Sequence, residues 1–514
     1  MMPLYILLIY TTMTGTLDHL LKNLITPDPP RPRIYSAQVL SNSAMLKLLG
    51  YQCPHVVKLV GILATKKVAL DASDTGVGKT YIAAAVCSEL NRRPIIVCPK
   101  TLIFNWQCVL EFFGVKAYDI VNYETLRNGK TYTNGRYCTR RKATYINKLI
   151  PDPANPNQYY EWNLPADAIV IFDEAHRCKD PSTDNGKLLV STKALIKAGI
   201  PVMLLSATIC ERLTDMKIPF YLTGLTSSTR AFSPFVKSLA SKYPKYRVRR
   251  RDYKTRELYN IARDTAQTMI VYEEAKGHTS RIRIKDLGSQ FPSNQWCAQQ
   301  FVADDPDKVS EAYAQIAVLM KQLRDNPGQN QLAQIQKLKQ EIEMRKVPIF
   351  IEQAGLHLEE GKSVIIFVNY LDSLKVIADQ LAIRCRIHGS QTIGERQRVI
   401  DLFQSNTERI IICQIRAGGT GIGLHDLDGA YPRVTLLNYP DTASDLLQAL
   451  GRAPRSGAKS PVLQRIIFVA NVDYERNIMR NINRKLANIS AINDGDLEGY
   501  KYAVKRITRT TPTK

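Results

Sequence analysis

Short apolar runs alternate with longer amphipathic segments along most of this chain. In its first half, each run is followed at once by polar or small residues; the runs are Val68–Leu70, Ile95–Cys98, Ala168–Phe172 and Val202–Leu205. This alternation is typical of a parallel sheet covered by helices. Because ligands of open α/β sheets bind at the carboxyl ends of the strands, we expect the residues after these runs to gather along one edge.

The same pattern returns after residue 347. Strands are predicted at Val364–Val368, Ile410–Cys413, Val434–Leu437 and Ile466–Val469, with helical stretches such as 370–381 and 394–403 between them. Before this second half, apolar residues fall at helical spacing on both sides of Asn326-Pro327-Gly328, which predicts a helical hairpin. A spacer role is favoured for this hairpin over a catalytic one.

These patterns predict an α/β protein with two parallel-sheet lobes and a helical hairpin inserted between them. The expected parts are an N-terminal arm (1–45), a first lobe (46–300), the hairpin (301–346), a second lobe (347–488) and a polar, basic tail (489–514). In the arm, the segment Pro27–Arg33 is too rich in proline for a regular helix. Residues 128–166 are predicted to be a surface insertion of the first lobe.

The composition indicates a folded protein that meets a polyanion. The chain has 514 residues, of which 45% are hydrophobic, and 70 Lys and Arg against 47 Asp and Glu give a net charge of +23. Such a balance is expected of a nucleic-acid-binding protein, although a basic protein that is merely soluble remains an alternative.

Two basic stretches leave alternatives open. Arg136–Lys142 lies in the insertion, where a solvated charged loop is favoured over a nucleic-acid contact. Lys242–Arg256 interleaves eight basic residues with three tyrosines, which suits phosphate contact and base stacking. A core-facing tyrosine stripe with solvated arginines would produce the same pattern, and the two interpretations are evenly balanced.

The cysteines and the apolar N-terminal segment indicate the cellular compartment of the protein. Ten cysteines are scattered singly without a Cys-x-x-Cys pair, which indicates reduced thiols of an intracellular, reducing compartment. The segment Met1–Tyr10 is apolar, but it lacks a basic leader and the length needed to span a bilayer. We therefore expect no membrane partner.

A glycine-rich turn follows the first apolar run and precedes a helix-forming segment, Tyr81–Leu90. Its residues, which we call the phosphate loop, are Asp74, Thr75, Gly76, Val77, Gly78, Lys79 and Thr80. Glycines allow close backbone approach to phosphates, Lys79 would reach the terminal phosphates, and the Thr80 hydroxyl would bind magnesium. The full signature has glycine where Ser73 stands, and a strand-to-helix turn that is merely glycine-rich is the alternative.

Acidic and basic residues elsewhere suit hydrolysis of a phosphate chain. Asp173 is placed to hold magnesium with Thr80, and Glu174 beside it can orient and deprotonate the attacking water. In the second half, Arg452 and Arg455 are three positions apart, so both could point from one helical face into the pocket and stabilise the transferring phosphoryl group. Such a site is complete only when a second lobe closes on the first.

Four segments together resemble the motifs of superfamily-two helicases, including a DEAH box: Asp74–Thr80, Asp173–His176, Ser206–Thr208 and Gln448–Arg455. A further set is similar to the Swi/Snf-like branch: Val97–Trp106, Asn122–Arg127, His388–Ser390 and Ala417–Leu424. The motifs stand in family order from about Tyr51 to Met479. Compact helicase-like proteins of large DNA viruses have a similar organisation.

The resemblance implies two RecA-like lobes with ATP and Mg²⁺ between them and nucleic acid lying across both. By motif position it assigns Gln52 to adenine and Gly421 to the nucleotide. It assigns coupling between the motifs to His176, Ser206, Thr208 and Gln448. The residues it assigns to nucleic acid are Pro99, Lys100, Thr101, Asn122, Tyr123, Asn369, Gly418 and Gly419.

Some positions depart from the Swi/Snf-like pattern. Ser206–Thr208 replaces the usual Gly-Thr-Pro, and Pro454 stands where a histidine is common, which argues against remodelling and leaves ATP hydrolysis intact. The leading hypothesis is a nucleic-acid-stimulated ATPase that translocates, on DNA rather than RNA, in the nucleus or at a viral replication site. The alternatives are a strand-separating DNA or RNA helicase and a non-catalytic basic scaffold. The sequence does not indicate protein partners.

Overall fold

The structure is a computed structural model of the 514-residue chain. It describes residues 40–133, 136–150, 159–208, 212–239, 267–291, 294–325, 329–418, 422–481 and 503–506. Most of the predicted N-terminal arm, the basic stretch 242–256 and most of the tail lie outside these ranges. Within them, no helix has both the length and the apolar character that crossing a membrane requires.

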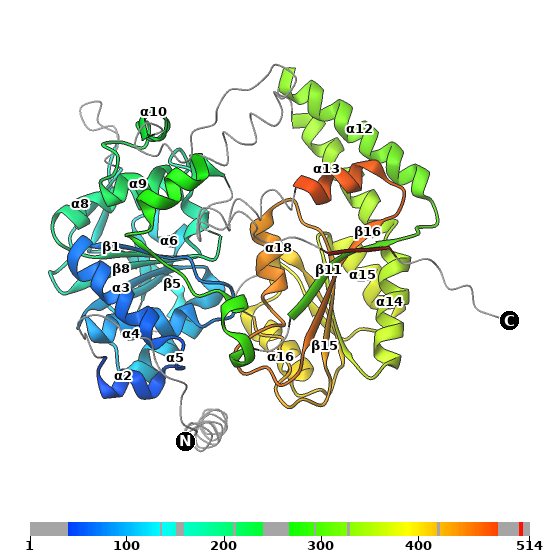
Figure 1. The fold of residues 1–514 in the computed structure, drawn as a ribbon, viewed down its shortest axis with the longest axis horizontal. Helices are drawn as coiled ribbons and strands as arrows, with labels where there is room; N and C mark the ends of the chain where they lie inside the picture. Colours follow the sequence, from blue (N-terminus) through cyan, green and yellow to red (C-terminus); the bar gives the residue numbers. More distant parts are fainter. Residues whose placement is uncertain are drawn as a thin grey trace. The chain divides into compact units, whose positions relative to one another are not determined.

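A six-stranded sheet forms the first lobe (Figure 1), with the strand order β10-β1-β9-β8-β2-β3. The strands are β1 (Val68–Asp71), β2 (Arg93–Cys98), β3 (Asp119–Asn122), β8 (Ala168–Asp173), β9 (Val202–Leu205) and β10 (Thr279–Ser280). All neighbouring strands pair in parallel, so their carboxyl ends share one edge. The four predicted apolar runs are confirmed as β1, β2, β8 and β9.

Helices pack on this sheet and on one another. They are α2 (Asn42–Lys47), α3 (Cys53–Lys66), α4 (Lys79–Glu89), α5 (Ile103–Phe113), α6 (Tyr123–Leu126), α7 (Asp184–Ser191), α8 (Lys193–Lys197), α9 (Lys217–Thr223) and α10 (Phe232–Ser238). Helix α3 buries Val56, Leu59 and Leu63 in the same core as the central strands. Its C-cap is Lys67, which takes a left-handed conformation with a φ of 63°.

The insertion consists of two antiparallel pairs. Strand β4 (Lys130–Thr133) pairs with β5 (Arg136–Lys142), and β6 (Ile146–Lys148) pairs with β7 (Tyr160–Trp162). The prediction of a loop at Arg136–Lys142 is therefore wrong, because these residues form one strand of a ribbon. The side chains of Arg140, Arg141 and Lys142 are nevertheless exposed to solvent.

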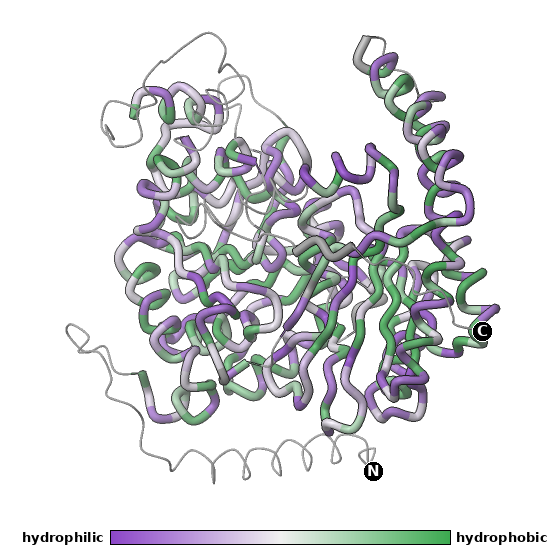
Figure 2. The backbone as a smooth tube through the Cα atoms, turned by 45° about the vertical axis from the view of Figure 1, so that its right-hand side comes forward, coloured by the Kyte–Doolittle hydropathy of each residue, from purple (hydrophilic) through white to green (hydrophobic). Residues whose placement is uncertain are grey.

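A seven-stranded parallel sheet forms the second lobe, with the order β13-β14-β12-β15-β16-β11-β17. Its strands are β11 (Asn294–Phe301), β12 (Ser363–Val368), β13 (Cys385–Ile387), β14 (Ile410–Gln414), β15 (Arg433–Asn438), β16 (Val462–Val469) and β17 (Ala503–Arg506). Along β12, Ile365 and Phe367 enter one apolar core while Val364, Ile366 and Val368 enter another. Both faces of β12 are thus buried, as its uninterrupted apolar run predicts. Figure 2 shows hydrophobic stretches of backbone in the interior of the fold.

The helices of the second lobe are α14 (Val347–Glu359), α15 (Leu371–Gln380), α16 (Ile393–Gln404), α17 (Ile415–Gly418) and α18 (Ala443–Leu450). The predicted hairpin is formed by α12 (Pro306–Asp325) and α13 (Gln329–Met344), which contact each other. Helix α16 begins with reciprocal hydrogen bonds between Thr392 and Glu395, which satisfy donors of its first turn.

Two strands belong to the second sheet although the predicted domain boundaries at residues 300 and 489 place them outside the second lobe. Strand β11 pairs with β16 along its whole length, so the second sheet includes Asn294–Phe301. Strand β17, which comes from the predicted tail, pairs with β11 on its other side. In chain order the helical hairpin therefore follows one strand of the second sheet and precedes another.

Candidate functional site

The phosphate loop has the backbone shape that phosphate binding requires. Gly76 and Gly78 have φ angles of 91° and 90°, in the left-handed region that favours glycine. A β-carbon would lie 2.8 Å from the Pro454 carbonyl oxygen at Gly76, and 2.5 Å from the Gln52 Nε2 atom at Gly78. Helix α4 begins at Lys79, so its N-terminal N–H groups adjoin this turn.

Lys79 and Gln52 both contact the loop itself. The Lys79 ammonium donates hydrogen bonds to the carbonyl oxygens of Ser73 and Asp74, at 2.9 and 3.0 Å. The Gln52 side chain is buried and donates to the Val77 carbonyl oxygen at 2.8 Å. A lysine held across the mouth of a left-handed glycine turn fits a site for the phosphates of ATP.

Ser73, which replaces the usual glycine, forms specific bonds. Its hydroxyl accepts a hydrogen bond from the Ile282 amide at 2.9 Å and lies 3.3 Å from the His55 Nε2 atom. The His55 ring also lies 3.2 Å from Asp71. Burial opposes the ionisation of Asp71, yet the His55 and Lys79 charges lower its pKa. The serine therefore fastens the start of the phosphate loop to the segment after β10.

The segment after β10 also holds Asp74, a contact that sequence reasoning missed. Arg281 forms an ion pair with Asp74 at 2.7 Å, and the Ile284 amide donates to the same carboxylate at 2.9 Å. Strand β10 has only two residues, which is too short for an apolar pattern to indicate.

The two predicted acidic residues stand at the end of β8. Asp173 accepts hydrogen bonds from the Trp106 indole at 2.8 Å and from the Glu174 amide at 2.9 Å. Burial, together with the neighbouring Glu174 charge, raises the pKa of Asp173 to about 6. Glu174 takes a left-handed conformation with a φ of 56°, which is uncommon for a residue with a side chain. This backbone turn directs Glu174 away from the regular course of the strand.

Predicted coupling residues surround Glu174. His176 Nδ1 lies 3.3 Å from Glu174 Oε2 and 3.1 Å from the Ser206 hydroxyl. The Ser206 hydroxyl also accepts a hydrogen bond from the Thr208 amide at 3.1 Å. Burial opposes ionisation of Glu174, but His176 and the Lys79 charge lower its pKa to about 2. Strands β8 and β9 are thus joined by hydrogen bonds next to the carboxylates.

The second lobe contributes residues to the same place. Gln448 Nε2 lies 3.3 Å from Glu174 Oε2 and 3.3 Å from His176 Nε2. The hydroxyls of Thr208 and Ser444 lie 2.8 Å apart. All four predicted coupling residues therefore form one hydrogen-bonded group that spans both lobes.

Arg452 and Arg455 reach the site from a loop. Helix α18 ends at Leu450, so the prediction that both arginines project from one helical face is wrong. Arg452 is buried and donates to the Gln448 carbonyl oxygen at 2.7 Å. A β-carbon at Gly76 would lie 3.4 Å from Arg455 Cγ, which places this side chain against the phosphate loop. Burial and the nearby Arg452 charge lower the pKa of Arg455 to about 9.

The residues assigned to nucleic acid differ in exposure. Lys100 is exposed beside the buried Pro99 and half-buried Thr101, at the carboxyl end of β2. In contrast, Asn122 and Tyr123 are buried. The Tyr123 hydroxyl donates to the Asp173 carbonyl oxygen at 2.7 Å, and Asn122 accepts from the Tyr132 hydroxyl at 2.6 Å. Their side chains form contacts inside the first lobe.

In the second lobe, the Asn369 amide is half-buried and donates to Glu343 at 3.0 Å and to the Tyr439 carbonyl oxygen at 3.1 Å. Gly418 ends α17, where a β-carbon would lie 2.7 Å from the Cys413 β-carbon. Gly419 and Gly421 lie outside the described residues.

A glycine-rich phosphate loop, an acidic pair at a strand end and arginines from a second parallel-sheet lobe define a two-lobe nucleoside-triphosphatase. Residues 45–210 match the family model "Type III restriction enzyme, res subunit", and residues 345–457 match "Helicase conserved C-terminal domain". A protein of Acanthamoeba polyphaga mimivirus, named "Putative ATP-dependent RNA helicase", is 63% identical over 486 residues, covering 94% of this chain and 90% of that protein.

Two solved structures are also similar. The S. cerevisiae Dbp5 structure bound to RNA and ADP BeF3 has 12% identity, 90% coverage of this chain, 94% coverage of that chain and a TM-score of 0.42. The Sulfolobus solfataricus SWI2/SNF2 ATPase core in complex with dsDNA has 18% identity, coverages of 91% and 96%, and a TM-score of 0.30.

This chain belongs to the superfamily-two helicases. It is an ATP-dependent, helicase-like enzyme that binds nucleic acid. The predicted likeness to helicase-like proteins of large DNA viruses is confirmed by the mimivirus relative.

Proposed function

We propose that this protein is a nucleic-acid-stimulated ATPase that translocates along DNA and hydrolyses ATP in the cleft between its two lobes. One observation carries this proposal: Gln448 of the second lobe lies 3.3 Å from both Glu174 and His176 of the first. ATP hydrolysis then depends on the position of one lobe relative to the other, and nucleic acid bound across both lobes can control the rate of hydrolysis.

Each group at the site suits one part of the reaction. Lys79 exchanges its bonds to the loop carbonyls for bonds to the terminal phosphates of ATP. Glu174, ionised at neutral pH, accepts the proton of the attacking water, while Gln448 and His176 orient its carboxylate. Arg452 and Arg455 stabilise the charge that develops on the transferring phosphoryl group.

Magnesium fits the donor set on the first lobe. The Asp173 carboxylate and the Thr80 hydroxyl offer the oxygen ligands that this ion prefers, and Asp173 is oriented by the Trp106 indole. Bound there, the ion would neutralise charge on the phosphate oxygens.

Hydrolysis is tested by phosphate release from the purified chain with and without nucleic acid. We expect stimulation by nucleic acid, and a loss of about 100-fold or more in Glu174→Gln, because a positioned base contributes about that much. Lys79→Ala should also be inactive. Unstimulated hydrolysis that does not need Lys79 would contradict the proposal. Equal activity of Glu174→Gln and the wild type would instead support the non-catalytic scaffold.

DNA is proposed as the substrate because the first lobe matches a restriction-enzyme subunit model and the chain carries a net charge of +23. A strand-separating RNA helicase is the second candidate, favoured by the name of the mimivirus relative and by Ser206–Thr208. Phosphate release should be compared across single-stranded DNA, duplex DNA and RNA at several salt concentrations. Displacement of a third strand without unwinding of a tailed duplex would identify translocation alone. We propose an intracellular, reducing location, in the nucleus or at a viral replication site.

A further inference from the structure

The ribbon formed by β4 and β5 carries closely spaced cations. Lys130 stands directly opposite Lys142, Thr131 opposite Arg141, and Tyr132 opposite Arg140. Because side chains alternate between the two faces of a ribbon, Lys130, Lys142 and Arg140 share one face, which also carries the buried Tyr132. The side chains of all these cations are exposed.

These charges lack acidic partners on the ribbon. Like charges directly opposite each other destabilise an antiparallel pair. Among the residues that the structure describes, Lys130, Arg140 and Lys142 form no ion pair with a carboxylate. A cationic face of this kind is complementary to a chain of phosphates, whose binding would remove the repulsion.

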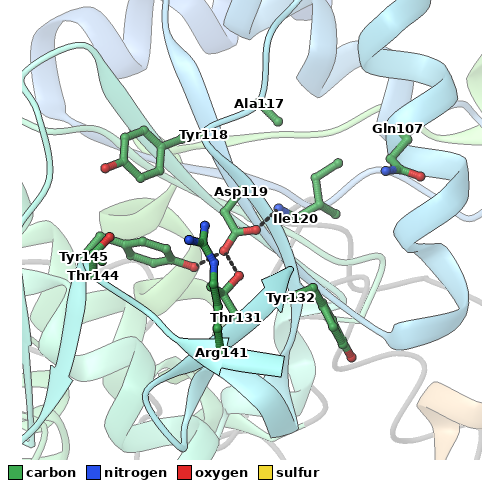
Figure 3. A pocket seen from close by; sticks show the side chains of 10 residues that line it. All are labelled: Gln107, Ala117, Tyr118, Asp119, Ile120, Thr131, Tyr132, Arg141, Thr144 and Tyr145. Atoms are coloured by element: carbon green, nitrogen blue, oxygen red, sulfur yellow. Dashed lines mark hydrogen bonds between the residues drawn. The ribbon is translucent and has the colours of Figure 1, made fainter. Parts of the chain in front are cut away.

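The ribbon is fastened to both ends of strand β3. At the last residue of β3, Asn122 accepts a hydrogen bond from the Tyr132 hydroxyl at 2.6 Å. At the first residue, Asp119 accepts hydrogen bonds from the hydroxyl of Thr131, in the ribbon, and from that of Tyr145, which follows β5. Figure 3 shows the hydroxyls of Thr131 and Tyr145 directed at Asp119. These three residues line a cavity of about 420 Å³. The ribbon therefore cannot shift without disturbing β3.

From β3 the contacts continue to the ATP site. Tyr123 follows Asn122 directly, is fully buried, and donates its hydroxyl proton to the Asp173 carbonyl oxygen at 2.7 Å. Two hydrogen bonds and one peptide bond thus connect the ribbon to the residue proposed to hold magnesium. Residue 132 lies in the insertion, whereas residue 173 ends a central strand of the sheet.

We propose that the β4–β5 ribbon binds the sugar-phosphate backbone of the nucleic acid, and that Tyr132 and Tyr123 couple this contact to Asp173. This inference rests on the proposed function, and it identifies one nucleic-acid contact of the first lobe and its route to the carboxylates. Tyr132 acts here as a positioning residue.

The contact is tested by replacing Lys130, Arg140 and Lys142 with glutamine in the full chain and measuring binding to a labelled single strand over a range of salt concentrations. Each phosphate contact contributes about 0.7 to the slope of log affinity against log salt for single strands, so the slope should fall by about 2. The matched control replaces the exposed Lys321, Lys337 and Lys375, with the same change in charge, and should keep the wild-type slope. Replacing Lys130 and Lys142 with arginine should also keep it.

A wild-type slope in the glutamine variant, with an unchanged melting temperature, would overturn the proposed contact. Nucleic acid that fails to stimulate wild-type hydrolysis would instead overturn the proposed function, so the two failures are distinguishable. If the glutamine variant does not fold, the charge is tested in the single variants Lys130→Gln and Lys142→Gln, each expected to lower the slope by about 0.7.

The coupling is tested with Tyr132→Phe, which removes the hydroxyl that donates to Asn122 and accepts a hydrogen bond from Thr125. We expect affinity within twofold of wild type and a maximal stimulated ATPase rate at least fivefold lower. Tyr118→Phe is the control, because Tyr118 lines the same cavity (Figure 3) and is not hydrogen-bonded to Asn122. A wild-type maximal rate in Tyr132→Phe would overturn the coupling.

Discussion

Gly451 is a position at which the second lobe closely approaches the phosphate loop. A β-carbon there would lie 1.8 Å from Thr75 Oγ1 and 2.4 Å from Thr75 Cβ, both well inside the 3.0 Å limit of real contacts. Rotation of the Thr75 side chain moves its hydroxyl but leaves its β-carbon in place. Gly451→Ala therefore forces the backbones apart next to Arg452 and Gln448, which follow and precede it.

Displacement of catalytic groups by about 1 Å can reduce a rate by about 100-fold, and we expect a loss of that order in kcat/KM for ATP. Phosphate release at saturating nucleic acid measures it. Gly451→Ala combined with Thr75→Gly removes the obstructing atoms and should recover most of the rate. Gly355→Ala, in helix α14 with no atom within 4 Å of the added carbon, is the control. Wild-type kcat/KM in Gly451→Ala would refute the close approach of the lobes.

Three further predictions concern buried polar groups. Ser73→Gly restores the usual loop residue but leaves the Ile282 amide without its acceptor, so we expect about 1–3 kcal/mol less stability by urea unfolding; an unchanged midpoint would show that the serine bond is dispensable. Glu475→Gln should lower the free energy of unfolding by about 3–5 kcal/mol, because it leaves the fully buried Lys346 ammonium, 2.6 Å away, without this counter-charge. A loss of unfolding free energy no larger than that of a surface variant would contradict this. Burial and the Arg455 and Arg433 charges lower the pKa of His425 to about 4, below its unfolded value of about 6.5. The contribution of neutral His425 to the free energy of unfolding is therefore complete above pH 6.5 and is lost as the pH falls toward 4. His425→Gln should therefore reduce the loss of unfolding free energy between pH 7 and pH 5 by about 2 kcal/mol, and parallel pH curves of the two proteins would contradict this.

The strands that could be predicted are those whose residues are uninterrupted apolar runs. Strand β12 reads Ser363–Val368 and is buried throughout, because helices cover both faces of its sheet. Strand β11 escaped prediction because it contains three glutamines and an asparagine, among which Gln299 is buried. Its strand conformation comes from pairing with β16 on one side and β17 on the other, and such long-range pairing leaves no local apolar pattern.

The residues of the site also fall into those that local sequence predicts and those that it does not. Lys79, Asp173 and Glu174 were predictable because each belongs to a short local motif whose residue types carry the chemistry. Their supporting partners are distant in sequence: Arg281 pairs with Asp74 across 207 positions. Residue type alone also could not indicate that Asn122 would be buried, because burial depends on how the ribbon folds over the edge strand β3.

The helical hairpin also forms specific polar contacts with the second sheet, which a simple spacer would not require. Glu343, near the end of α13, is buried and accepts hydrogen bonds from the Asn369 amide at 2.9 Å, from its side chain at 3.0 Å and from the Tyr370 amide at 2.9 Å. These donors form the turn that follows β12, at the carboxyl edge of the second sheet. Burying a carboxylate is costly unless several donors surround it, so this arrangement fixes the turn relative to α13. A movement of the hairpin would therefore reach the edge at which Gln448 and Arg452 meet the first lobe.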